Sequence, residues 1–147
     1  MKLALRSTAA TNNWWLRFCA WLTRARLCSQ WCHGAIVIDG LLYQANTARG
    51  LHCTADWNPA HWTLIDIGKC HEKRALAIFE ARDGAPYDWL GVLGFALPVR
   101  GDRRALYCFE WCAIAIGAPP ARWQTPERLL SYILMKEKRP CRSCCTC

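Results

Sequence analysis

The sequence predicts an α+β domain in which an antiparallel sheet packs against helices. One observation is a hairpin pattern: two apolar runs, residues 35–38 and 41–45, flank Asp39-Gly40, a dipeptide typical of two-residue turns. Another is the apolar segment 108–116, which has the length of a helix and stops at Gly117. The chain has 147 residues, 53% of them hydrophobic, which indicates one compact domain with a sizeable core.

Shorter patterns predict the remaining elements. We expect a strand over residues 62–67, a helix over 72–81 and a loop over 49–59. Thr125-Pro126 predicts the start of a last helix, because Thr can cap a helix and Pro suits its first turn.

Both ends of the chain are predicted to lie outside the main domain, which spans residues 30–135. Residues 1–29 are expected to be a loose leader followed by an amphipathic helix over 14–27. That helix packs on the domain or lies on a membrane surface. Residues 136–147 form a basic, Cys-rich tail without periodic apolar positions, which we expect to be dispensable for folding.

Composition limits the classes of partner and compartment. The formal net charge of +8 favours an anionic partner such as nucleic acid, acidic lipid or cell-wall polymer, or a basic surface with no specific partner. Nucleic acid is not expected, because no recognition helix, zinc finger or RNA-binding motif is visible. No segment approaches the ~20 apolar residues of a membrane span. Eleven cysteines, an odd number, without a visible signal peptide predict free thiols in the cytoplasm.

Cys108 is the candidate nucleophile. It lies where a predicted strand turns into the helix 108–116, and a helix N-terminus stabilises a thiolate and a developing oxyanion. We therefore expect Cys108 to be the most acidic thiol of the chain. Cys112, one turn later, is expected in the core.

His33 is the candidate base, and the hairpin fixes its neighbours. With Asp39-Gly40 as the turn, His33, Gln44 and Asn46 share one face of the sheet. Gln44 or Asn46 can accept a hydrogen bond from the imidazole and set its tautomer, which is the third role in a triad. The other histidines, at 52, 61 and 71, are expected on the surface.

The segments Gly84-Ala-Pro-Tyr-Asp-Trp89 and Tyr107-Cys-Phe-Glu-Trp-Cys112 resemble those of NlpC-type cell-wall endopeptidases. In those enzymes the His strand follows the Cys helix, whereas here Cys32-His-Gly-Ala-Ile-Val-Ile-Asp-Gly40 precedes it. This order resembles the circularly permuted branch of the papain-like superfamily, which includes YiiX-like and lecithin:retinol acyltransferase-like proteins, many of them bacterial or phage-encoded. The resemblance covers roughly residues 30–133.

The resemblance implies a permuted papain-like core and a cysteine hydrolase that cleaves an amide, most often in bacterial cell-wall peptides, without a cofactor or metal. Lipid amides and esters are substrates elsewhere in the same branch. Cys108 matches the nucleophile, His33 the base, Gln44 the third polar position and Tyr87 an active-site tyrosine beside the nucleophile. Asn46 is the reserve for Gln44. The chain departs from the family at Gln44, often Glu or His there, and at Phe109, commonly Ser.

Two other classes of function compete with the hydrolase. Cys28 and Cys32-His33, together with the tail cysteines, supply soft ligands at spacings seen in zinc modules. A degenerate hydrolase that binds but does not cleave would retain the fold and the basic charge.

Overall fold

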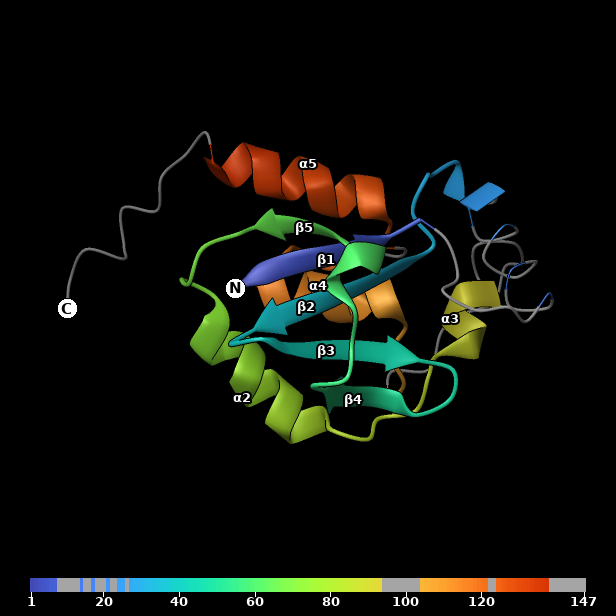
Figure 1. Cartoon of the computed structure of the whole chain (residues 1–147), viewed down its shortest axis with the longest axis horizontal. Coiled ribbons are helices and arrows are strands. Elements are labelled where there is room, and N and C mark those ends of the chain that lie inside the picture. The colour runs from blue at the N-terminus through green and yellow to red at the C-terminus, as the bar shows by residue number, and fades with distance from the viewer. Residues whose placement is uncertain are drawn as a thin grey trace.

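The computed structural model describes residues 1–7, 14, 17, 21, 24, 25, 27–93, 104–121 and 124–137. It confirms the α+β class: a five-stranded antiparallel sheet in the order β4-β3-β2-β1-β5, with helices packed against it (Figure 1). The strands are β1 (Lys2–Arg6), β2 (His33–Ile38), β3 (Leu41–Asn46), β4 (Gly50–Thr54) and β5 (Thr63–Asp66).

The predicted hairpin is formed by β2 and β3. Ile38 pairs with Leu41 and Val37 with Leu42, which is the register that a two-residue turn requires. Asp39 has a φ of 48° and Gly40 a φ of 81°, so both turn residues adopt the left-handed conformation of a type I′ turn. The turn therefore fixes which side chains of β2 and β3 share a face.

The expectation of a loose leader is wrong for residues 2–6. They form β1, which pairs with β2 on one side and β5 on the other and so lies inside the sheet. Leu3, Ala4 and Leu5 are fully buried. Burial on both faces stabilises this short strand, although its partners lie far along the chain.

The expectation of a loop over residues 49–59 is wrong for β4. Residues 50–54 pair with β3, from Asn46↔Gly50 to Leu42↔Thr54. Gly50 starts the strand with a φ of +68°, and a Cβ there would collide with the carbonyl oxygen of Ala85. Only glycine fits both the conformation and the space.

The helices are η1 (Pro59–His61), α2 (Glu72–Arg82), α3 (Trp89–Leu93), α4 (Cys108–Ile116) and α5 (Pro126–Glu137). The predicted C-terminal end of α4 and the predicted start of α5 are confirmed. Gly117 ends α4 with a φ of 70°, and the backbone N–H of Arg128 donates to Thr125 Oγ1 at 3.3 Å near the start of α5. Since α5 extends to Glu137, the tail begins later than residue 136.

Different elements pack against the two faces of the sheet. On the first, which we call the helix face, α4 packs against β2 and β3, with α2 and α5 beside it (Figure 1). Gly34 permits this close approach, since a Cβ there would lie 3.0 Å from two ring carbons of Phe109. On the second, the tryptophan face, Trp57 and Trp62 from the segment between β4 and β5 cover Ala35, Val37 and Leu42.

The predicted helix over residues 14–27 is helical at each of its described positions. Trp14 and Trp21 are 73% and 60% exposed there. The cysteines of the tail lie outside the described residues. Among the helices that the structure describes, none combines the length and apolar character needed to cross a membrane.

Candidate active site

Cys108 opens α4 on the helix face and is buried. Residues 104–107, the described residues directly before it, do not form the expected strand; Leu106 instead makes an isolated bridge to Tyr87. That bridge brings Tyr87 to the thiol, as the resemblance implied. Hydrogen bonding from the Tyr87 hydroxyl and from the backbone N–H groups of Gly34 and Phe109 acts to lower the pKa of the Cys108 thiol.

The expectation that Cys108 is an acidic thiol is wrong for this arrangement. Burial raises its pKa from 9.0 to about 11, although all three hydrogen bonds act in the opposite direction. Burial also raises the pKa of Tyr87 well above its usual value, so the phenol stays protonated and remains a donor. At neutral pH the site therefore holds a neutral thiol that is surrounded by donors.

His33 and Gln44 meet on the tryptophan face as predicted. The Nε2 of His33 lies 2.9 Å from Gln44 Oε1, and because an amide oxygen only accepts, Nε2 carries the proton. The Gln44 amide then faces His52 Nε2 at 3.5 Å, and His52 Nδ1–H donates to Gly50 O at 3.0 Å. This chain of bonds leaves Nδ1 of His33 as its lone-pair nitrogen.

The imidazole of His33 is neutral at physiological pH. Burial and, to a lesser extent, the charge of Arg6 lower its pKa from 6.5 to about 4, while the bond to Gln44 acts in the opposite direction. Its ring also packs against Trp62, with centroids 5.7 Å apart. A neutral imidazole with a fixed tautomer is the form that accepts a proton.

The predicted contact between Cys108 and His33 is not formed. Gly34 contacts α4 and donates to Cys108, and side chains alternate along a strand, so His33 points to the opposite face. Among the described residues, His33 has Gln44 as its hydrogen-bond partner. Both side chains nevertheless lie at the same end of β2, because Gly34 directly follows His33.

Asn46 does not take part in the pairing with His33. Its Oδ1 accepts from the backbone N–H groups of Ala48 and Arg49 at 3.0 and 2.9 Å, which closes the turn between β3 and β4. The expectation that His52 is a surface residue is wrong, since it faces Gln44 and Asn46. In the sequence, Leu51-His52-Cys53 alternates apolar and polar residues as a strand does, but the expectation of a loop over residues 49–59 ignored this pattern.

Glu110 is a third titratable group near Cys108. It occupies the third position of α4, and its carboxylate accepts from the backbone N–H of Tyr107, as in one half of a capping box. Burial and the nearby Asp88 raise the pKa of Glu110 from 4.5 to about 7. Its Oε2 is buried without a hydrogen-bond partner.

The structure does not support the zinc alternative within the described residues, because no three His, Cys, Asp or Glu side chains there are grouped to hold a metal ion.

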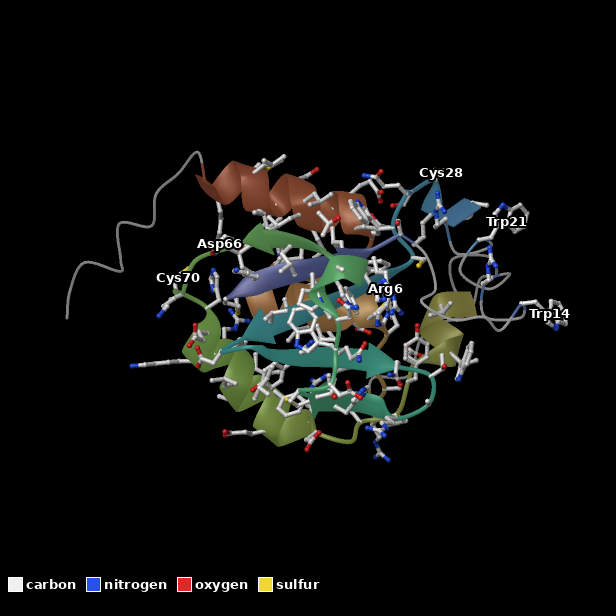
Figure 2. All side chains as sticks on the ribbon, in the orientation of Figure 1. Arg6, Trp14, Trp21, Cys28, Asp66 and Cys70 are labelled. Atoms are coloured by element: carbon white, nitrogen blue, oxygen red, sulfur yellow. The ribbon has the colours of Figure 1, made fainter. Side chains whose placement is uncertain are left out.

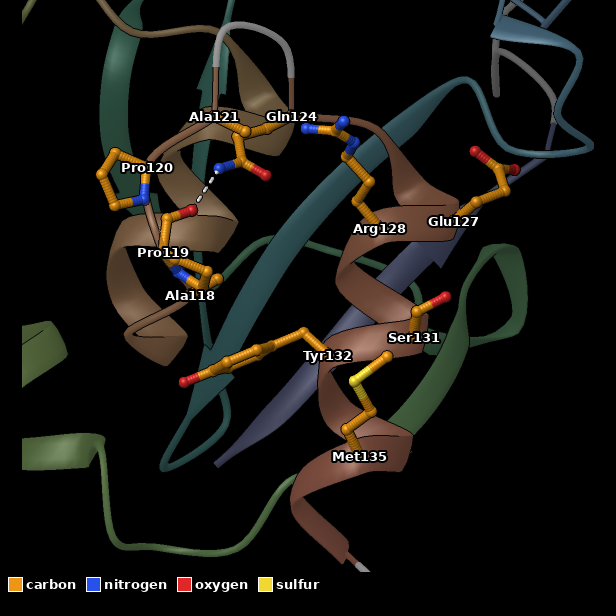
Figure 3. A pocket seen from close by; sticks show the side chains of 10 residues that line it. All are labelled: Ala118, Pro119, Pro120, Ala121, Gln124, Glu127, Arg128, Ser131, Tyr132 and Met135. Atoms are coloured by element: carbon orange, nitrogen blue, oxygen red, sulfur yellow. Dashed lines mark hydrogen bonds between the residues drawn. The ribbon is translucent and has the colours of Figure 1, made fainter.

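A hollow of about 470 Å³ lies between α5 and the segment after α4 (Figure 3). Gln124 there donates its Nε2–H to Pro119 O at 3.0 Å. The lining contains neither Cys nor His, so the hollow lacks the predicted chemistry.

Cys108 with Tyr87 and His33 with Gln44 are thus two hydrogen-bonded pairs at one end of β2, on its two faces. Comparisons of the chain with protein-family models, curated proteins and solved structures found no match.

Proposed function

We propose that this protein is a cysteine-nucleophile hydrolase that transfers an acyl group from an amide to water through Cys108. The observation that carries the proposal is the set of donors around its sulfur: the Tyr87 hydroxyl and the N–H groups of Gly34 and Phe109. Donors that converge on one point stabilise a thiolate and the oxyanion formed by attack next to it. A cysteine that only fills the core has no need of them.

Cys108, His33 and Tyr87 each act in a defined step of the proposed reaction. As the Cys108 sulfur attacks the amide carbon, its proton passes to Nδ1 of His33, and the carbonyl becomes an oxyanion held by Tyr87 and the start of α4. His33 returns the proton to the departing amine, which leaves a thioester. His33 then removes a proton from a water that attacks the thioester, and the acid and the free thiol are released.

The proposal requires that His33 reaches the helix face during the reaction. Its ring starts on the tryptophan face, held by Gln44 and Trp62. This movement is large, because His33 pairs with Arg6 across the sheet, so the end of β2 has to unpair from β1 and rotate before the ring reaches Cys108. Contacts between catalytic groups often tighten only when substrate binds.

The substrate class follows the sequence resemblance: an amide of a bacterial cell-wall peptide. A lipid amide or ester is the alternative within the same fold. A second candidate function is a binding protein without catalysis, and it is favoured by the placement of Cys108 and His33 on opposite faces and by the raised pKa of Cys108.

Labelling with a broad acylating probe, followed by mapping of the modified residue by mass spectrometry, separates these candidates. The hydrolase proposal expects an acyl-enzyme at Cys108 in the folded chain that is lost in Cys108→Ala and slowed at least tenfold in His33→Gln. Cys112→Ala, one turn further along α4, is the matched control. Labelling that is indifferent to His33 would remove its role as base, and absence of labelling at Cys108 would leave the binding protein.

A further inference from the structure

Two arginines beside the candidate site, Arg6 and Arg24, have no anionic partner among the residues that the structure describes. Arg6 ends β1 and pairs with His33 across the sheet, so the two side chains share the tryptophan face. Figure 2 shows Arg6 at the end of the sheet opposite to Asp66 and Cys70. Its guanidinium lies over Trp62, 4.8 Å from the ring centroid. Arg24 is the second arginine, from the helical segment that precedes Cys32.

Both guanidinium groups are partly buried, and neither has all of its N–H groups in hydrogen bonds. The Nε atoms of Arg6 and Arg24 are buried without a hydrogen-bond partner. Neither arginine forms an ion pair with a described residue, whereas the amino group of Met1 pairs with Glu72. A buried cation that lacks a counter-charge is costly, and such a group needs an explanation.

The charges of both arginines act on Cys32, but its thiol carries no negative charge that could neutralise them. Its sulfur lies 3.3 Å from the carbonyl oxygen of Arg6, and both guanidinium charges act on the thiol. Burial still raises the pKa of Cys32 above 9.0. At neutral pH the thiol is therefore protonated, and Cys108, on which Arg6 also acts, is protonated for the same reason.

The sequence supplies no acid from the neighbouring segment either. The first 38 residues contain five Lys and Arg and no Asp or Glu, and the first acid, Asp39, lies at the far end of β2. This end of the sheet therefore has an excess of positive charge next to the candidate nucleophile. A bound anion would supply the missing counter-charge.

We propose that Arg6 and Arg24 form an anion subsite at the Arg6 end of the sheet that binds a carboxylate of the substrate. The planar fork of a guanidinium matches a carboxylate with two parallel hydrogen bonds, and stacking on Trp62 holds the Arg6 fork in one plane. The role in cleavage rests on the proposed function, whereas the binding of the anion does not. The substrate is then an acidic amide rather than a neutral one.

The subsite is tested by NMR of the arginine Nε–H groups in the full chain labelled with ¹⁵N-arginine, titrated with glutarate and separately with inorganic phosphate. We expect saturable shifts of the Arg6 and Arg24 signals with glutarate. Arg6→Gln should weaken glutarate binding at least about tenfold, and Arg6→Lys, which keeps the charge without the fork, should weaken it too. Arg49→Gln, an exposed arginine of the β3–β4 turn, is the matched control and should leave binding unchanged.

Several outcomes would overturn the proposal. Glutarate that shifts neither signal, or that binds equally well after Arg6→Lys, would remove the subsite. Phosphate that binds more tightly than glutarate would remove the carboxylate assignment. The same titration on Cys108→Ala separates the two proposals: binding there, together with no acyl-enzyme in the wild-type chain, refutes the hydrolase and leaves the subsite in place.

Discussion

Glu110→Gln should make the protein more resistant to unfolding above neutral pH and less dependent on pH. Glu110 has a pKa of about 7 in the folded chain against 4.5 for an ordinary Glu, because burial and Asp88 disfavour its ionised form. A raised pKa means that the folded state holds the proton more tightly than the unfolded state. The stabilisation is present in full below pH 4.5 and is lost as the pH rises to about 7.

The expected change in unfolding free energy follows from the size of the rise in the pKa of Glu110. At about 1.4 kcal/mol for each pH unit, a rise from 4.5 to about 7 corresponds to about 3 kcal/mol. The carboxyl group is half-buried, so solvent screening reduces this to roughly 1–2 kcal/mol. Gln has the same shape, no charge, and an oxygen that still accepts from the Tyr107 N–H.

Urea unfolding of both proteins between pH 5 and pH 8 measures the effect. The difference in unfolding free energy between Glu110→Gln and wild type should grow in favour of the variant by roughly 1–2 kcal/mol over this range. Glu127→Gln, in the exposed first turn of α5, removes the same charge and is the control for a general effect of charge on stability. A constant difference for Glu110→Gln would refute the raised pKa and the burial from which it follows.

Three further predictions concern other parts of the site. Gly34→Ala should destabilise the fold by about 1–3 kcal/mol in thermal denaturation, because the added Cβ would lie 3.0 Å from the Phe109 ring; an unchanged melting temperature would contradict this. His33 should titrate near pH 4 by NMR, and a midpoint near 6.5 would mean that its ring is exposed. Cys108 should react with a maleimide more slowly than the exposed Cys28 at pH 7 in the folded chain, and reaction of Cys108 first would show that its thiol is ionised there.

The hairpin and α4 could be predicted because their signals are local. Asp39-Gly40 fixes the turn and the register, and with them the contact between His33 and Gln44. The left-handed residue at Gly117 likewise marks the end of α4. In each case the residues that determine the structure are neighbours in the sequence.

The strands β1 and β4 were missed because their evidence is not local. β1 has only five residues and finds its partners in β2 and β5, after long intervening segments. Leu51 of β4 is buried on one side of the strand, and His52 faces Gln44 on the other. The sequence of β4 therefore contains few apolar residues and resembles that of a loop. The placement of Cys108 relative to His33 depends on which face α4 covers, and no pattern in either segment specifies that.

The position of β1 also shapes how the chain acquires its structure. β1 leaves the ribosome before every other strand, yet both its neighbours in the sheet are made later, and β5 later than β4. β1 can pair with β2 once residue 38 has emerged, but its other edge, which pairs with β5, stays open until residue 66 has emerged. Pairings this distant are slow to form, and open edges attract other chains. Insertion of β1 is therefore the step at which nascent copies of this protein are most exposed to aggregation, and hydrogen exchange during refolding should protect the amides of β1 last.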